Sequence, residues 1–164
     1  MKVAKRFRWE AAHRIPWHDA GCRFVHGHSY RMMVELEGEP TDASPGGGAM
    51  LIDFKHVKRM VKPLVDAMDH STLVNESDTE LREAMEALES KIYVIQSDTT
   101  AENLALHVAD QIRTTGREVL NRHGVETIRV QVWETETCYA EAERLVNADE
   151  SEPAKAAEMA TEPA

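Results

Sequence analysis

The sequence contains only two cysteines, Cys22 and Cys138, among its 164 residues. Two cysteines are too few for a disulfide-based scaffold of this length. The chain also lacks any apolar run near the roughly 18 residues that a membrane-spanning helix requires. Its first ten residues, MKVAKRFRWE, alternate in character and have no continuous apolar core, which is not the pattern of a signal peptide. We therefore expect a cytoplasmic protein with free thiols and no membrane partner.

Basic residues are in the minority, because 19 lysines and arginines face 29 aspartates and glutamates, giving a net charge of −10. This excess argues against binding to nucleic acid or to anionic membranes, since both would be repelled. The length suits one domain with a real core. We predict a folded domain over residues 1–146 and a disordered acidic Ala/Glu-rich tail over residues 147–164, where the apolar residues are only alanines and one methionine.

A strand-like alternation over residues 26–38 carries two histidines. The residues that share one face are His26, His28, Tyr30, Met32, Val34 and Leu36. Polar or small residues fill most of the positions between them, so the segment reads as a half-buried β-strand. His26 and His28 point to the same side of this strand, where both imidazoles can reach one metal ion.

A third histidine, His13, lies on the mostly apolar face of an earlier predicted strand, residues 2–15. If the two strands are antiparallel neighbours, three imidazoles converge and leave a tetrahedral position open, as in catalytic zinc sites. The alternative is a set of hydrogen-bonded histidines in the core. Three histidines in phase would then each need partners for two ring nitrogens.

Further patterns predict an α+β fold. Strands over residues 2–15, 26–38, 50–52 and 127–135 would form an antiparallel four-stranded sheet, with two long helices on one face. The first helix begins after Asp53 as its N-cap, and Pro63 should kink or end it. The second begins near Ala101, after a capping box. Residues 75–91 suggest an exposed helix, within an acidic stretch at 75–97 that could be an insertion. A sheet this small has open edges, so we expect an oligomer.

Cys22 lies in a loop four residues before His26. It could be an ordinary loop residue, a fourth zinc ligand that closes the site, or a thiolate base beside the metal. A nearby cation lowers the pKa of a thiol toward neutrality, which would favour the third role. The sequence pattern leaves these alternatives open.

Two acidic positions also have alternative roles. The Asp69-His70 pair could be a helix C-terminus or an imidazole that shuttles protons while aspartate orients it. Glu134, the odd member of an apolar strand face, could turn to solvent. It could instead accept two hydrogen bonds from a planar N–H, N–H edge, such as that of a pterin or guanine.

With these residues in hand, the chain resembles the 6-pyruvoyl-tetrahydropterin synthase family, and most closely its bacterial 6-carboxy-tetrahydropterin synthase branch from queuosine biosynthesis. The matching segments are FRWEAAHRIP at 7–16, CRFVHGHSY at 22–30, MLIDFKHVK at 50–58, MDH at 68–70, TTAEN at 99–103 and VWET at 132–135. The spacing from Cys22 to His26 is similar to that of the 6-carboxy branch, whereas Thr99-Thr100 looks more like the animal enzymes.

The resemblance implies a T-fold whose subunit sheets join into a barrel, commonly in a hexamer with active sites between subunits. The implied zinc ligands are His13, His26 and His28. The implied catalytic residues are Cys22 as the base and Asp69 with His70 as a relay. The implied pterin contacts are Glu134, Thr99 and Thr100.

The implied reaction is a zinc-dependent conversion of 7,8-dihydroneopterin triphosphate to 6-carboxy-5,6,7,8-tetrahydropterin, with release of acetaldehyde and triphosphate. The alternatives are 6-pyruvoyl-tetrahydropterin synthase, which eliminates triphosphate only, and a non-catalytic pterin- or purine-binding T-fold protein. An acidic protein that binds a triphosphate needs a local basic patch. Arg14, Arg23 and Lys55 are candidates for it.

Overall fold

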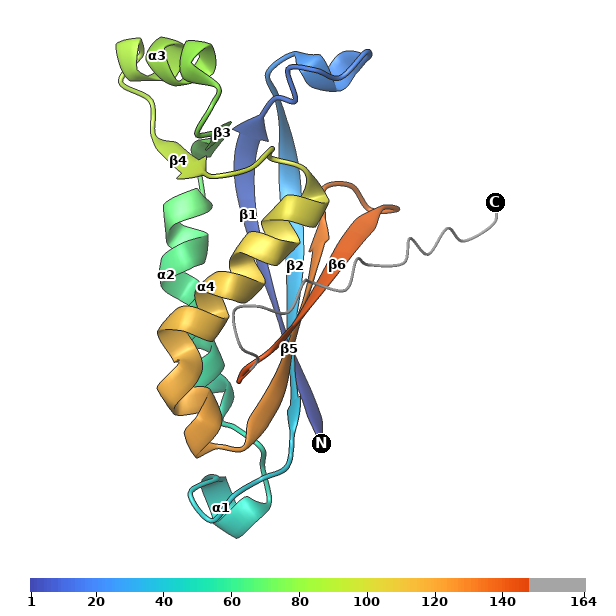
Figure 1. Cartoon of the computed structure of the whole chain (residues 1–164), viewed down its shortest axis with the longest axis vertical. Coiled ribbons are helices and arrows are strands. Elements are labelled where there is room, and N and C mark those ends of the chain that lie inside the picture. The colour runs from blue at the N-terminus through green and yellow to red at the C-terminus, as the bar shows by residue number, and fades with distance from the viewer. Residues whose placement is uncertain (148–164) are drawn as a thin grey trace.

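The computed structural model describes residues 1–147, and residues 148–164 of the predicted tail lie outside the described part. Figure 1 shows an elongated molecule whose longest strands run along the long axis. The elements are β1 (Lys2–His13), a 3-10 turn (Gly21–Arg23), β2 (His26–Gly38), α1 (Pro45–Gly48), α2 (Phe54–Met68), β3 (Ser71–Asn75), α3 (Thr79–Ala87), β4 (Ile92–Ile95), α4 (Ala101–Arg122), β5 (Val125–Trp133) and β6 (Tyr139–Leu145).

The described residues form one six-stranded sheet in the order β4-β3-β1-β2-β5-β6. The pairs β1–β2, β2–β5 and β5–β6 are antiparallel, whereas β3 runs parallel to both β1 and β4. The prediction of a four-stranded antiparallel sheet was therefore wrong in strand number and in the direction of two pairings. The antiparallel pairing of β1 with β2, on which the predicted metal site depends, is confirmed.

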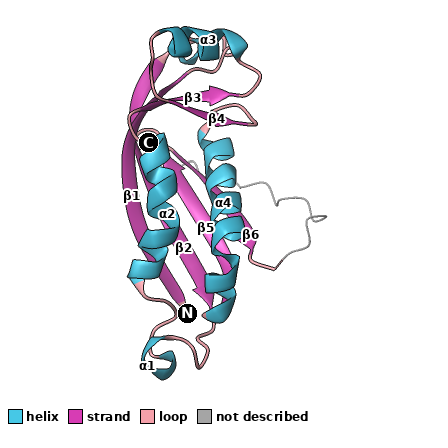
Figure 2. Cartoon of the chain, turned by 90° about the vertical axis from the view of Figure 1, so that its left-hand side faces the viewer, coloured by secondary structure: helices cyan, strands magenta, loops and turns pink. Residues whose placement is uncertain are grey.

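The two long helices α2 and α4 lie side by side over one face of the sheet, as Figure 2 shows and as predicted. Apolar side chains from every second strand position meet the helices there. Trp9 of β1 and Tyr30 of β2 are fully buried and stack at 5.0 Å between ring centroids. The opposite face, here called the uncovered side of the sheet, carries the alternate residues, such as Arg8, Glu10 and Ser29, which are exposed.

One local prediction fails, and one of two alternatives for Pro63 is excluded. Residues 50–52 form no strand, although Leu51 and Ile52 are buried in the core, so this short apolar run reflects burial and not extended pairing. Pro63 does not end α2, which continues to Met68. The predicted cap of α2 is confirmed, since Asp53 accepts a hydrogen bond from the Lys55 amide. α4 begins at Ala101 as predicted, but its N-cap is Thr100, which accepts from the Asn103 amide, and not Thr99 of the predicted capping box.

The turn between α4 and β5 depends on Gly124, which has a φ of +71°. A Cβ at this position would lie 1.9 Å from the Glu39 carbonyl oxygen. We expect Gly124→Ala to lower the free energy of unfolding by about 2–4 kcal/mol, because it combines backbone strain with a clash against backbone.

Urea unfolding measures this loss. Gly21→Ala is the matched control, because a Cβ there meets nothing within 4 Å and should change the stability by less than about 0.5 kcal/mol. Equal midpoints for the two variants would show that the turn does not require glycine.

Candidate metal centre and active site

Three histidines meet where β1 ends and β2 begins. In the β1–β2 register His13 is directly opposite His26, and Ala11 is opposite His28. The three rings lie on the helix-covered side, with centroids 4.6–5.1 Å apart. One potential ligand atom from each residue lies within 4.8 Å of those of the other two. These three residues, the histidine cluster, can therefore hold a metal ion.

Hydrogen bonds fix the orientation of two of these rings. His13 Nδ1 donates to the Thr99 carbonyl oxygen at 2.8 Å, and His26 Nδ1 donates to the Phe24 carbonyl oxygen at 2.8 Å. Nε2 is then the free lone-pair nitrogen of each ring. Metal-binding histidines are commonly held in this way by a second hydrogen bond. The Nε2 atom of His13 is buried without a hydrogen-bond partner in the described structure, as expected for an atom reserved for a metal.

Burial favours the neutral form of two of the three histidines, His13 and His28. It lowers the pKa of His13 to about 4, although the Thr99 carbonyl opposes the shift. Burial also lowers the pKa of His28, and charge on His26 adds to the effect. Neutral imidazole is the form that binds a metal ion, so the residues present fit a zinc ion with three nitrogen ligands.

Glu134 directly follows β5 and turns toward the histidine cluster. Its Oε1 lies 3.9 Å from His13 Nε2, and it has no hydrogen-bond partner in the described residues. The Tyr30 hydroxyl, on the same side of the sheet, is also buried and unpaired. Burial raises the pKa of Glu134, and the negative charge of Glu102 adds to the rise. The unpaired carboxylate can thus accept hydrogen bonds from a ligand beside the cluster.

Glu102, which the sequence reasoning did not single out, belongs to the same region. It is exposed in the first turn of α4, and its charge acts on Glu134. The signal available in the sequence was its place in the capping pattern TTAEN at 99–103. A capping pattern is enough to explain a glutamate at this position, and only the fold brings it near Glu134.

The loop between β1 and β2 carries Cys22 in its 3-10 turn. The Ile15 amide donates to the Cys22 carbonyl at 2.8 Å, which ties this loop to the end of β1 just beyond His13. Cys22 is half-buried and is not among the clustered ligand atoms in the described part of the chain. The geometry therefore does not favour the fourth-ligand alternative.

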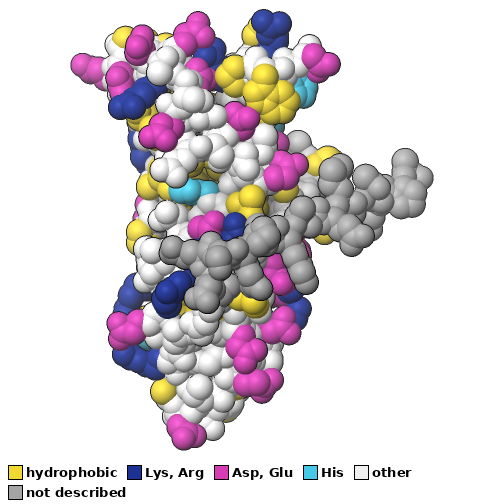
Figure 3. Space-filling model, viewed as in Figure 1, with side chains coloured by type: hydrophobic (Ala, Val, Ile, Leu, Met, Phe, Trp, Pro, Cys, Tyr) yellow, Lys and Arg dark blue, Asp and Glu magenta, His cyan; other side chains and the backbone are white. Residues whose placement is uncertain are grey.

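The same loop exposes hydrophobic surface. Figure 3 shows acidic side chains scattered over this view, whereas hydrophobic ones gather on the upper right lobe that Figure 1 identifies as the β1–β2 loop. Its exposed hydrophobic residues are Trp17, Phe24 and Val25. Such a grouping beside a candidate site is typical of a surface that binds a ligand or another protein chain.

Asp69 and His70 form a hydrogen-bonded pair at 2.9 Å between Asp69 Oδ2 and His70 Nδ1. The other Asp69 oxygen accepts from the Glu10 amide, and this bond lowers the pKa of Asp69. His70 is largely exposed and lines a hollow of about 450 Å³ with Glu10 and Ser29, on the uncovered side of the sheet. One member of the histidine cluster, His28, also lines this hollow, so within one chain the pair and the cluster border the same depression.

The remaining predicted residues have structural partners. Thr99 is buried and its hydroxyl donates to the Arg14 carbonyl, while Thr100 caps α4. Two of the three candidate triphosphate contacts have acidic partners in the structure. Arg14 pairs with Asp78 and Glu80, and Lys55 pairs with Asp53. The third, Arg23, lies over the Phe24 ring.

Arg14, which follows β1, donates two hydrogen bonds of 2.6 and 2.8 Å to Asp78, the N-cap of α3. It lowers the pKa of Asp78 from its ordinary value of 3.8. We expect Asp78→Asn, which keeps the helix cap, to lower the free energy of unfolding at pH 7 by about 1 kcal/mol.

A carboxylate with a depressed pKa stabilises the fold above its unfolded pKa and loses that effect as the pH falls through the folded value. The difference from the wild type should hence shrink below about pH 4. Urea unfolding at several pH values measures it, with the exposed Asp42→Asn as control. A difference that stays constant with pH would show that the charge pair is not its source.

The chain is similar to tetrahydropterin synthases in sequence. Residues 2–145 match the family described as 6-pyruvoyl tetrahydropterin synthase. The 6-carboxy-5,6,7,8-tetrahydropterin synthase of Haemophilus influenzae is 30% identical over 145 residues, covering 86% of this chain and 97% of the relative. A protein of Pyrococcus abyssi named putative 6-carboxy-5,6,7,8-tetrahydropterin synthase is 33% identical over 157 residues, covering 86% and 91%.

Solved structures agree on the fold. The 6-pyruvoyltetrahydropterin synthase of Plasmodium vivax has a TM-score of 0.70 at 19% identity, over 88% of this chain and 98% of that one. The Caenorhabditis elegans 6-pyruvoyl tetrahydropterin synthase has a TM-score of 0.59 at 21% identity, over 86% and 93%. Among residues 1–147, none of the helices has the length and hydropathy needed to span a bilayer. The fold is a T-fold, and the chain belongs to the 6-pyruvoyl tetrahydropterin synthase family.

Proposed function

We propose that this protein is a zinc-dependent lyase that converts 7,8-dihydroneopterin triphosphate to 6-carboxy-5,6,7,8-tetrahydropterin, with release of acetaldehyde and triphosphate. This reaction belongs to queuosine biosynthesis. The observation that carries the proposal is the histidine cluster, held by hydrogen bonds and bordered by an unpaired carboxylate, in a chain similar to 6-carboxy-5,6,7,8-tetrahydropterin synthases over 86% of its length.

The chemistry divides between the metal and three side chains. Zinc bound by the histidine cluster would act as a Lewis acid on side-chain oxygens of the substrate and acidify the neighbouring C–H. Cys22, in the loop tied to the end of β1, takes the proton from that carbon on its sulfur. His70 relays the proton, and Asp69 holds its imidazole through the 2.9 Å hydrogen bond.

Glu134 and the turn at Thr99-Thr100 hold the pterin ring in this proposal. A buried carboxylate with a raised pKa and no partner is unfavourable by itself. A planar N–H, N–H edge would give it two hydrogen bonds and bring its pKa down again. Thr99 lies next to this position, since its carbonyl already holds His13.

The active site is completed between subunits in our proposal. His70 is largely exposed and opens into a hollow of about 450 Å³, where a neighbouring copy can approach it. The sheet of the described residues also ends in the edge strands β4 and β6, which a neighbouring copy could cover. A hexamer in which the sheets close into a barrel would satisfy both requirements.

The test of the function is incubation of the purified protein with 7,8-dihydroneopterin triphosphate and zinc, followed by mass spectrometry of the pterin product and detection of acetaldehyde. We expect 6-carboxy-5,6,7,8-tetrahydropterin and acetaldehyde. A 6-pyruvoyl product without acetaldehyde would identify the second candidate, 6-pyruvoyl-tetrahydropterin synthase, which the names of the matching family and of the structural neighbours favour. Binding without turnover would indicate a pterin-binding protein.

Sites shared between subunits predict complementation. Cys22→Ala and His70→Ala should each be inactive alone. When equal amounts of the two are unfolded together and reassembled, the mixture should recover about a quarter of the wild-type activity. With random pairing of subunits, about one in four of the sites between subunits contains both an intact Cys22 and an intact His70. The steady-state rate of the mixture measures this. Recovery no greater than the sum of the separate variants would place Cys22 and His70 in the same subunit's site.

A further inference from the structure

A second hollow, of about 460 Å³, lies on the uncovered side of the sheet. Its polar lining consists of Arg6 and Arg8 of β1, Arg31 of β2, and Glu136, which follows β5; Trp133 forms one wall. We call it the arginine hollow. None of these residues belongs to the histidine cluster, which lies on the other side of the sheet.

The register of the strands forces the three arginines together. Arg8 lies directly opposite Arg31, and Arg31 lies opposite Trp133 on the next strand. Arg6 is two residues from Arg8 on the same strand, and its side chain therefore points to the same side. Like charges directly opposite each other across a sheet are destabilising, so this arrangement calls for a counter-charge.

The described residues supply only part of that counter-charge. Arg31 forms an ion pair of 2.8 Å with Glu136, but Arg6 and Arg8 contact no carboxylate within residues 1–147. The hollow hence carries three positive charges against one negative charge, on a protein whose overall charge is −10. In a chain with more acidic than basic residues, arginines without an acidic partner are unexpected.

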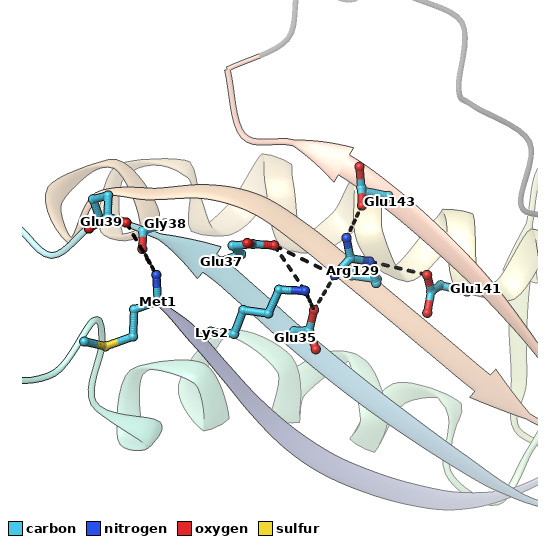
Figure 4. Close-up of polar contacts among 9 residues, drawn as sticks. All are labelled: Met1, Lys2, Glu35, Glu37, Gly38, Glu39, Arg129, Glu141 and Glu143. Carbon is cyan, nitrogen blue, oxygen red and sulfur yellow. Dashed lines mark hydrogen bonds and ion pairs between the residues drawn. The ribbon is translucent and has the colours of Figure 1, made fainter.

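Another arginine on the same side of the sheet shows the contrast. Arg129 of β5 is surrounded by Glu35, Glu37, Glu141 and Glu143, as Figure 4 shows. Lys2 adds a second positive charge to this network. Four acidic residues of the uncovered side are thus gathered around Arg129, next to the edge strand β6, whereas Glu136 is the one described carboxylate that lines the arginine hollow.

We infer that the arginine hollow is a binding site for an oligophosphate chain. Arg6 and Arg8 are about 7 Å apart along their strand, from the rise of about 3.3 Å per residue. Guanidinium groups spread over this length suit several linked phosphoryl groups better than one small anion. Each guanidinium can donate two parallel hydrogen bonds to phosphate oxygens, and the bound chain would relieve the repulsion between Arg8 and Arg31.

The site is separate from the proposed reaction centre, and its test does not require turnover. Inorganic tripolyphosphate is the probe, with sulfate as the single-anion comparison, in calorimetric titrations of the full-length protein at low salt. We expect saturable binding of tripolyphosphate that weakens as salt rises, because the contacts are exposed ion pairs. Sulfate should bind at least about tenfold more weakly, since it can engage fewer guanidinium groups at once.

Substitutions of residues that line the arginine hollow test whether tripolyphosphate binds there. Arg8→Gln should weaken tripolyphosphate binding about tenfold or more, through the loss of charge-assisted hydrogen bonds. Glu136→Gln should tighten it several-fold, because it removes the one carboxylate that lines the hollow among residues 1–147, and misfolding cannot mimic a gain in affinity. Arg117→Gln, an exposed arginine on α4 without an ion pair in the described residues, should leave the affinity unchanged.

His28→Ala separates this inference from the proposed function. It alters the histidine cluster and should leave tripolyphosphate binding unchanged, whatever the fate of the enzymatic activity. Absence of saturable binding by the wild type would overturn the inference. Affinities unchanged in both Arg8→Gln and Glu136→Gln, or lost in His28→Ala, would also overturn it.

Discussion

His28→Ala should lower the zinc content of the purified protein from about one ion per chain to less than about a tenth of that, and abolish turnover. If the three protein ligands share the binding free energy of zinc, removing one of them should weaken zinc affinity by roughly two to three orders of magnitude. The neighbouring rings cannot compensate, because His13 and His26 are each fixed by a carbonyl through Nδ1. Metal analysis after dialysis against a weak chelator measures the loss.

The matched control is His56→Ala, which makes the same chemical change on α2. His56 packs near His123 at a ring distance of 5.4 Å and belongs to no clustered set of potential ligands in the described structure. Zinc content and turnover should stay at the wild-type level in this variant. Full zinc occupancy in His28→Ala would contradict a site built from three imidazoles.

Cys22→Ala should lower turnover by about three orders of magnitude or more, as expected for the loss of a positioned general base, while zinc stays near one ion per chain. The sulfur is absent from the set of clustered ligand atoms, so its removal leaves the three nitrogen ligands in place. Single-turnover kinetics and metal analysis on the same preparation separate the two effects. Cys138→Ala is the control, because Cys138 is exposed and free.

The outcome for zinc in Cys22→Ala decides between two accounts of this cysteine. Retained zinc with lost turnover supports a base beside the metal. Zinc lost together with turnover would make the thiolate a ligand, and the site would then be a closed structural one. Turnover close to the wild type would remove Cys22 from the mechanism altogether.

The parts of the fold that the sequence predicts are those in which side-chain period and burial coincide. β2 spans His26–Gly38 as predicted, because alternate positions from His26 to Leu36 are more buried than the positions between them. That alternation also placed His26 and His28 on one side. The pairing with β1 then brought His13 opposite His26 without any further information.

The missed strands lack that alternation. β3 is buried at four consecutive positions, so it shows no polar face, and β4 is only four residues long. β6 (YAEAERL) is an edge strand with two alanines and several charged residues, which has little resemblance to a buried strand. Residues 50–52 show the opposite error, because their side chains are buried without any strand pairing.

The candidate site divides in the same way. Histidines on alternating strands could be identified from their spacing, whereas the partners that orient them come from distant segments. Thr99 reaches His13 across 86 positions of the chain, and Glu102 acts on Glu134 from the start of a helix. Contacts of this kind depend on how the sheet and helices pack, and local sequence patterns do not encode them.

X-ray absorption at the zinc edge reports which atoms surround the metal, so it tests whether three imidazoles bind the ion while the Cys22 sulfur stays unbound. We expect three imidazole nitrogens and one oxygen at about 2.0–2.1 Å from the zinc, with no sulfur. A sulfur at about 2.3 Å in the zinc shell, or fewer than three nitrogens, would contradict it.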